Sequence, residues 1–261
     1  MVESIRVEHV TKNFTLQYHR TFKQMTVAMA KGQDVSNTFT AVDDVSFSVQ
    51  QGESIGLMGL NGSGKSTLLK VINGVMRPDK GQVLTRGRIA GLIATGAGFH
   101  PQLTGRENIY LNAAVMGLTE KETDKIFDEV VEFADIGRFL DVPVNTYSSG
   151  MKSRLGFSVA VHIDSDIFLA DEVLAVGDKY FKRKCLAKME EIRNSGRTIF
   201  YVSHAEASVK RMCERVLVLE KGKLAFDGPV EEGIHYFQYG EELTGEEDEL
   251  ALEDAELGAD I

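Results

Sequence analysis

The residues best suited to chemistry lie in a glycine-rich stretch, Gly59–Thr67, which reads GLNGSGKST. This spacing follows G-x-x-x-x-G-K-[ST], in which successive backbone N–H groups can curl around a phosphate. We expect Lys65 to reach the β- and γ-phosphates of a nucleotide and the Ser66 hydroxyl to ligate Mg²⁺. The residues expected to bind nucleotide here are Gly59, Asn61, Gly62, Ser63, Gly64, Lys65, Ser66 and Thr67.

Two apolar stretches further along the chain also end in polar residues. Residues 167–170 precede Asp171 and Glu172, and a second stretch, RTIFYVSH, ends in His204. In phosphate-loop enzymes an aspartate at this place holds Mg²⁺ through water, and an adjacent glutamate can polarise the attacking water. We therefore expect Asp171 to bind the metal ion, and Glu172 and His204 to act in hydrolysis of ATP.

A second anion site is predicted in the segment TYSSGMKSRL, residues 146–155. Ser148, Ser149 and Gly150 lie where a helix should begin, and the free N–H groups of a helix N-terminus attract anions. If this helix and the glycine-rich loop lie on different lobes, they cannot easily close on one nucleotide. We therefore expect a head-to-tail pair of chains that buries two ATP molecules.

Elements of an α/β fold must position these residues. Strands alternate with helical stretches, and residues 55–58 form an apolar strand directly before the glycine-rich loop. This order predicts a mostly parallel sheet with its ligand at the carboxyl ends of the strands. Capping boxes at Thr104–Glu107 and Thr119–Glu122 predict two helices, so a helical subdomain of about residues 100–162 is expected as an insertion.

Charge and composition exclude several other classes of protein. The net charge is −10, but residues 241–261 hold ten acidic and no basic residues, so the rest of the chain is neutral. A neutral body argues against electrostatic binding to nucleic acid. We expect an ATPase domain over residues 1–240, followed by a disordered acidic tail over residues 241–261. No apolar run long enough to span a membrane is found, and Cys185 and Cys213 are expected to be reduced thiols.

The chain resembles the ATPase subunit of ABC transporters. The resemblance lies in the order and spacing of five features: the glycine-rich loop, the serine-glycine segment, Asp171 with Glu172, Asp178 and His204. The resemblance covers roughly residues 3–230 and implies a P-loop NTPase fold: a RecA-like core, an N-terminal antiparallel β subdomain and an inserted helical subdomain. It also implies ATP with Mg²⁺, a homodimer, a dimer of integral-membrane permease subunits, and a place on the cytoplasmic face of the cell membrane. Asp178 is then expected to contact nucleotide.

The chain departs from the family pattern at two places. The usual Leu-Ser-Gly-Gly-Gln signature is replaced by residues 147–151, YSSGM. The glutamine that the family usually places between the phosphate loop and the helical subdomain is also missing: residues 92–99 contain none, and Gln102 comes only after Pro101. The family stacks adenine on an aromatic side chain after the first strand. Phe14 is expected to do so here, and Phe39 is the second candidate because residues 15–38 look like an insertion.

The segment GAGFHPQLTGRENIYLN resembles the subgroup that exports lipid-linked polysaccharides, namely O-antigen, teichoic acid and galactan. The insertion at 15–38 fits this subgroup, in which it lies near the membrane partner, although a variable surface loop is an equal interpretation. The chain is too short for a C-terminal glycan-binding β-sandwich, so the polysaccharide is expected to be handled only indirectly. This favours the teichoic acid and galactan exporters, and among them the actinobacterial galactan exporter.

Three other interpretations remain open at this stage. The chain could be the ATPase of an importer, or an ABC ATPase of translation or DNA maintenance, although those usually carry two cassettes or long coiled coils. It could also be a module that binds ATP without hydrolysing it. The presence of Lys65, Asp171, Glu172 and His204 together argues against this last possibility.

Overall fold

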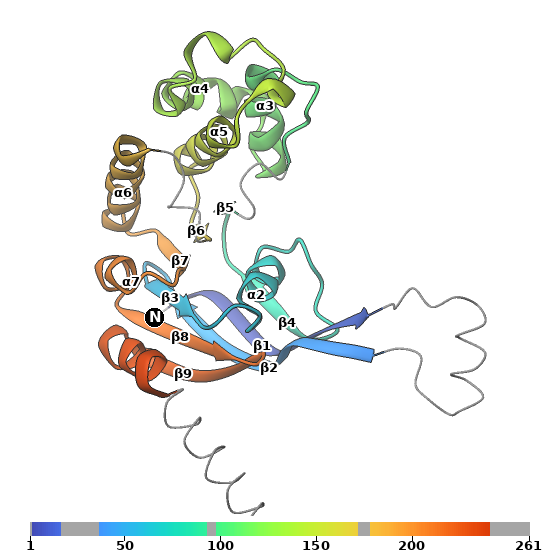
Figure 1. Ribbon diagram of the computed structural model, residues 1–261, viewed down its shortest axis with the longest axis vertical. Helices are drawn as coiled ribbons and strands as arrows, with labels where there is room; N and C mark the ends of the chain where they lie inside the picture. The colour runs from blue at the N-terminus through green and yellow to red at the C-terminus, as the bar shows by residue number, and fades with distance from the viewer. Residues whose placement is uncertain (1, 17–36, 93–97, 172–177, 241–261) are drawn as a thin grey trace, which may run out of the picture.

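The computed structural model describes residues 2–16, 37–92, 98–171 and 178–240. A six-stranded sheet with the order β5-β6-β7-β3-β8-β9 forms its centre (Figure 1). Its strands are β3 (Ser54–Met58), β5 (Ile89–Leu92), β6 (Ile167–Ala170), β7 (Thr198–Val202), β8 (Arg215–Glu220) and β9 (Lys223–Pro229). All neighbours are parallel except β8 and β9, so the predicted α/β fold with a mostly parallel sheet is confirmed.

The central strands are buried because both faces of the sheet are covered. Alternate residues of β7 point to opposite faces: Phe200 and Val202 belong to one apolar cluster, and Ile199 and Tyr201 belong to another. One cluster packs the sheet against α2 and a second sheet, and the other packs it against the remaining helices of the core. The helices of the core are α2 (Lys65–Ile72), which packs on the first cluster, and α6 (Lys179–Asn194), α7 (Glu206–Met212) and a helix over residues 230–240, which pack on the second.

An antiparallel sheet with the order β2-β1-β4 packs on the first cluster. Its strands are β1 (Glu3–Leu16), β2 (Asn37–Gln50) and β4 (Lys80–Thr85). Register shifts interrupt the pairing of β1 with β2 between Val7 and Asn13, and beyond them Phe14 pairs with Phe39. The predicted insertion at 15–38 falls almost entirely in 17–36, and the predicted acidic tail is 241–261; both segments lie outside the described residues.

Three helices between β5 and β6 form what we call the helical lobe, which lies at one end of the molecule (Figure 1). Both predicted capping boxes are confirmed: the Thr104 hydroxyl accepts from Glu107 N at 3.2 Å, and the Thr119 hydroxyl from Glu122 N at 3.3 Å. The elements of the lobe are α3 (Gly105–Val115), α4 (Glu120–Ala134), η1 (Gly137–Phe139), η2 (Val144–Thr146) and α5 (Ser149–His162). The exact limits of a separate subdomain stay a prediction.

One arginine ties the two sheets together. Arg215, at the start of β8, donates to both carboxylate oxygens of Asp227 on β9 at 2.6 and 2.7 Å. The same guanidinium donates to Glu53 at 3.0 Å and to the carbonyl of Ser48 on β2 at 3.0 Å. Because these bonds share one rigid fork, the antiparallel sheet is fixed relative to the sheet that carries the glycine-rich loop.

Candidate active site

The glycine-rich loop connects β3 to α2 in a conformation that its glycines make possible. Gly59 has φ 143° and Gly64 has φ 105°, both in the region that side chains disfavour. A Cβ on Gly59 would overlap the carbonyl oxygen of Leu219, and one on Gly64 would overlap that of Ala41. Gly64 caps α2 without a side-chain hydrogen bond, so the first turn of this helix presents backbone N–H groups to the loop. This donor set suits a phosphate.

Lys65 lies inside the loop with only 7% of its surface exposed. Its ammonium group donates to the carbonyl oxygens of Gly59 at 2.6 Å and Leu60 at 2.8 Å. Ser63 Oγ is also buried, and the described structure offers it no hydrogen-bond partner. A buried cation, an unsatisfied hydroxyl and a ring of amide donors therefore surround the same small space, and all of them favour an anionic ligand.

A pocket of about 230 Å³ lies over this loop. It brings the loop together with Asp171, which follows β6, and His204, which follows β7. These residues converge because β6, β7 and β3 are parallel neighbours whose carboxyl ends meet at one edge of the sheet. The residues that line the pocket are Phe39, Ala41, Asn61, Gly62, Gly64, Lys65, Ser66, Thr67, Asp171 and His204.

The pocket also distinguishes the two aromatic candidates. Phe39, on β2, lines the pocket and is 48% exposed, so one side of its ring is open to a ligand. Phe14 pairs with Phe39 across the two strands, but it is not among the described residues that line the pocket. The stronger expectation from the sequence was Phe14, and the geometry favours Phe39. Ala41 is a further lining residue that no sequence pattern indicated.

Glu172, expected to polarise the attacking water, lies outside the described residues. Its predicted role stays a prediction, although its neighbour Asp171 lies in the pocket. Within the described ranges, no cluster of three or more His, Cys, Asp or Glu side chains could hold a metal ion. One carboxylate and one hydroxyl, Asp171 and Ser66, do fit Mg²⁺, because this ion usually takes one or two protein ligands and completes its shell with phosphate and water.

The serine-glycine segment lies at the start of α5, as predicted. Ser148 is the N-cap of this helix, and its hydroxyl accepts from Met151 N at 3.2 Å. Ser148 and Ser149 are exposed, and Gly150 is half-buried. Among the described residues, none of these three lines the pocket over the glycine-rich loop of the same chain. An exposed helix N-terminus outside the pocket leaves this donor group open to a ligand held elsewhere.

Asp178 is the N-cap of α6 and faces the signature helix of its own chain. Its carboxylate accepts from Phe181 N at 2.9 Å and forms an ion pair with Arg154 of α5. The Phe181 N–H and the Arg154 guanidinium hold the pKa of this carboxyl below its usual value. The guanidinium also lies 5.0 Å from the Phe181 ring centroid. In the single chain Asp178 therefore joins α6 to α5, and its predicted contact with nucleotide stays a prediction.

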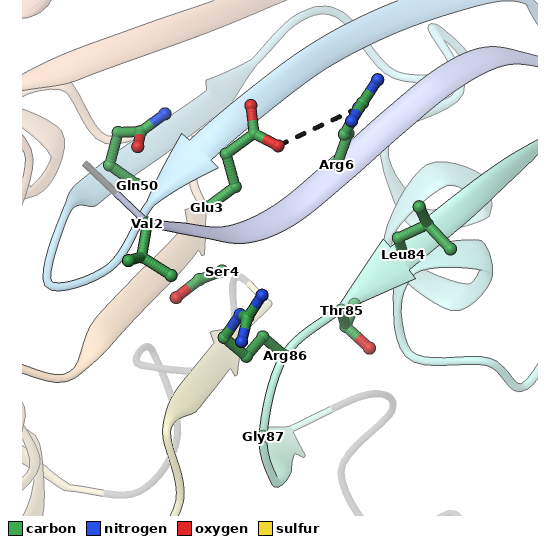
Figure 2. A pocket seen from close by; sticks show the side chains of 9 residues that line it. All are labelled: Val2, Glu3, Ser4, Arg6, Gln50, Leu84, Thr85, Arg86 and Gly87. Atoms are coloured by element: carbon green, nitrogen blue, oxygen red, sulfur yellow. Dashed lines mark ion pairs between the residues drawn. The ribbon is translucent and has the colours of Figure 1, made fainter.

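A larger hollow of about 810 Å³ lies where the start of β1 meets the end of β4 (Figure 2). The residues that line it include the buried Ser4 and an ion pair of Arg6 with Glu3 at 3.9 Å. None of the residues predicted to bind nucleotide lines it among those described. Its wide opening and exposed charges are typical of a solvated surface, so the smaller pocket over the glycine-rich loop is the candidate site.

Comparison with known proteins identifies the family. The family model described as ABC transporter matches residues 42–175, which hold the glycine-rich loop, the helical lobe and β6. The chain belongs to the ABC transporter family. The expectation that it is an ATPase of this family is confirmed.

Three curated relatives in the ABC transporter family cover most of the chain. It is 42% identical to the ABC transporter protein AbcA of Aeromonas salmonicida, over 93% of this chain and 78% of that protein. It is 42% identical to the O-antigen export system ATP-binding protein RfbB of Klebsiella pneumoniae, over 90% of this chain and 97% of that protein. It is 45% identical to the teichoic acids export ATP-binding protein TagH of Bacillus anthracis, over 90% of this chain but 42% of that protein.

Solved ABC structures share the fold. A dimeric ATP-binding cassette in a post-hydrolysis state, bound to ADP and phosphate, matches with a TM-score of 0.68 and 22% identity, over 87% of this chain and 98% of that one. An ATP-binding subunit of an ABC transporter matches with a TM-score of 0.69 and 24% identity, over 90% of this chain and 93% of that one. The predicted P-loop NTPase fold is confirmed. No helix in the described part of the chain is long and apolar enough to cross a bilayer.

Proposed function

We propose that this chain is the ATP-hydrolysing subunit of an exporter of lipid-linked polysaccharide. The observation that carries the proposal is the pocket in which Lys65, Ser66, Asp171 and His204 meet. These four residues come from three separate parts of the chain, and each has the chemistry that phosphoryl transfer requires. The relatives TagH and RfbB, whose names state teichoic acid and O-antigen export, support the class of cargo.

In this proposal, ATP lies along the pocket with its phosphates at the start of α2. The backbone N–H groups of 62–67 bind the β- and γ-phosphates, because the glycines let these donors converge. Lys65 exchanges its bonds to Gly59 and Leu60 for the phosphate oxygens. Phe39 stacks on the adenine, since its half-exposed ring lines the pocket.

Ser66 and Asp171 are proposed to hold Mg²⁺, which neutralises charge on the phosphates when bound. The Ser66 hydroxyl and the Asp171 carboxylate, which both line the pocket, would hold the ion, the carboxylate by way of a water molecule. Glu172 orients and polarises the attacking water, and His204 donates toward the γ-phosphate from the end of β7. Fixed donors that surround the transferred phosphoryl group lower the barrier, because they need not reorganise during the reaction.

A second copy of the chain is proposed to complete each site. The exposed N-terminus of α5, with Ser148, Ser149 and Gly150, lies outside its own pocket and has donors for a γ-phosphate. Two chains arranged head to tail bring each such end onto the ATP of the other. The solved dimeric cassette of the same fold supports this arrangement. Asp178, next to the same surface, is proposed to join this interface.

The proposed complex includes a pair of membrane-spanning permease subunits, with the ATPase on the cytoplasmic face of the membrane. Closure of the pair on ATP moves the two helical lobes, and hydrolysis releases them, so the chain handles its cargo only through the permease. The residues that line the pocket bind nucleotide in this proposal and carry no preference for a sugar, so galactan as the specific glycan stays a prediction.

The ATPase part of the proposal is tested with the purified chain and three variants. Glu172→Gln should remove most turnover while ATP binding stays intact, and it should trap an ATP-dependent dimer in size-exclusion chromatography. Ser148→Arg should remove turnover and also prevent the dimer, because a bulky cation replaces the N-cap. Glu132→Ala, an exposed polar change on α4 of the helical lobe, serves as the control that keeps activity. A monomer that hydrolyses ATP equally well with Ser148→Arg would disprove the paired site.

The export part needs a cellular measurement. Depleting the chain in its own organism should cause lipid-linked polysaccharide to accumulate inside the cell and to decrease at the surface. Restoring the chain should reverse both changes, and restoring Glu172→Gln should not. Normal surface glycan in depleted cells that hold an active ATPase would overturn the export function and leave the ATPase assignment intact.

A further inference from the structure

The position of the serine-glycine segment depends on the chain just before it. Residues 142–146 pair with residues 101–105: Val144 N donates to Leu103 O at 2.9 Å, and Asn145 N donates to Pro101 O at 2.8 Å. Gly105 N donates back to the carbonyl of residue 142 at 3.3 Å. The segment that leads into Ser148 is therefore held by the segment that leads into α3.

Tyr147, directly before Ser148, fixes the end of this pairing. Only 5% of its surface is exposed, and its hydroxyl donates to the carbonyl of Phe139. A Cβ on Gly105 would overlap the Tyr147 hydroxyl, so the first residue of α3 touches the first residue of the signature, 147–151. A shift of residues 101–105 would thus be transmitted to the start of α5.

Residues 100–104 are in turn organised by one side chain, Asn108 of α3. Its amide is fully buried and satisfied: the oxygen accepts from His100 N at 2.7 Å. The nitrogen donates to the carbonyl oxygens of His100 at 3.1 Å, Leu103 at 3.0 Å and Thr104 at 2.9 Å. These groups belong to a turn that lacks a regular strand or helix, so the Asn108 amide replaces the backbone ladder that would otherwise fix it.

We propose that Asn108 is a positioning residue for ATP hydrolysis. It holds the turn 100–104, the turn holds 142–146, and these set the place of Ser148 and Gly150 relative to ATP on a second copy of the chain. This inference rests on the proposed paired site. Asn108 acts in trans, on the ATP of the partner, and leaves ATP binding by its own glycine-rich loop unchanged.

The first test compares Asn108→Ala with Asn112→Ala. Asn112 is also buried on α3, and the described bond of its amide nitrogen is to the carbonyl of residue 108 within the same helix, at 3.2 Å. Because a displacement of about 1 Å at a reacting group can cost roughly 100-fold in rate, we expect kcat of Asn108→Ala to fall about 10- to 100-fold. The Kd for ATP, measured by calorimetry, should stay within twofold of the original chain, and Asn112→Ala should keep its kcat. A fall in kcat that is equal for both variants would overturn the inference.

The second test separates action in trans from action in cis by mixing two variants, one without activity and one with kcat reduced at least tenfold. Lys65→Ala removes the phosphate lysine but keeps an intact serine-glycine segment. Mixed with Asn108→Ala, it should form pairs in which one of the two sites has an original loop and an original Asn108. Random pairing of equal amounts gives about one quarter of full activity. If Asn108 acted on its own loop, both sites of the mixed pair would be damaged and no activity would return.

The mixture of Lys65→Ala with Ser148→Arg is the reference for the paired site itself. Activity restored with Ser148→Arg but not with Asn108→Ala would disprove the role of Asn108 and leave the proposed function standing. No activity in either mixture would remove the paired site and this inference with it. If Asn108→Ala does not fold, Asn108→Asp keeps the acceptor for His100 N while losing the donor group, and the same mixtures apply.

Discussion

Replacing Phe39 by alanine tests which aromatic side chain binds the base. Phe39 lines the pocket over the glycine-rich loop and is 48% exposed, whereas Phe14 is not one of the described lining residues. We expect Phe39→Ala to weaken ATP binding strongly and Phe14→Ala to change it little. Phe39→Tyr, which keeps an aromatic face, should bind ATP like the original chain.

The magnitude follows from the open face of the ring. A phenylalanine side chain contributes about 150–250 Å², so its exposed 48% is about 70–120 Å². A base that covers one face removes roughly half of this from water, together with a similar area of its own, for a total of about 70–120 Å². At about 25 cal/mol per Å², the loss is about 2–3 kcal/mol, or roughly 30- to 150-fold in Kd.

Calorimetric titration of the three variants with ATP and Mg²⁺ measures this difference. Thermal unfolding should show a midpoint lower by about 4–12 °C for Phe39→Ala, because about half of the removed side chain is buried, so the titrations are made well below the midpoints of all variants. A loss of affinity in Phe14→Ala, with none in Phe39→Ala, would refute the assignment made from the pocket. It would restore the assignment expected from the sequence.

Three further predictions concern stability and the loop. Arg215→Ala should lower the free energy of unfolding by about 2–3 kcal/mol and the thermal midpoint by about 4–12 °C, because hydrogen bonds to Asp227 and Glu53 are lost. An unchanged thermal midpoint would contradict this expectation. Hydrogen bonds from Thr119 and Arg88 lower the pKa of Glu122 to about 2. The ionised carboxylate therefore contributes fully to stability above about pH 4.5, and this contribution is lost as the pH falls toward 2. A titration midpoint near 4.5, measured by NMR, would show that these bonds do not form in solution. Gly64→Ala should weaken ATP binding at least tenfold, since a φ of 105° is strained for alanine and the added methyl group overlaps Ala41. An unchanged Kd for ATP, measured by calorimetry, would refute the need for this glycine.

Local patterns made much of the fold predictable. Four local predictions are confirmed: the capping boxes at Thr104 and Thr119, the strand before the glycine-rich loop and the helix that begins after Ser148. Each of these elements depends on residues that are close together in the sequence. The convergence of Asp171 and His204 was also predictable, since both follow apolar strands of a parallel sheet.

Features that depend on distant pairing were not predictable from the sequence. Phe39 lines the pocket and Phe14 is not among its described lining residues, and this placement depends on how β1 and β2 pair, which no local pattern encodes. The contact of Asp178 with Arg154 joins two helices separated by β6. Asn108 looked like an ordinary polar residue of a helix, and only the turn folded over it shows that its amide makes four bonds.

The strand order also constrains how the chain folds. β3 leads into the glycine-rich loop, yet its hydrogen-bonded neighbours are β7 and β8, in pairs such as Gly56 with Tyr201 and Leu57 with Leu217. On the ribosome, this apolar strand therefore waits for partners made about 140 residues later, and such distant pairing is intrinsically slow. A nascent chain that ends after the helical lobe has the loop sequence but lacks β7 and β8, the strands that pair with β3. The chain can become an ATPase only once nearly all of it has been synthesised, and until then β3 is a surface for chaperones.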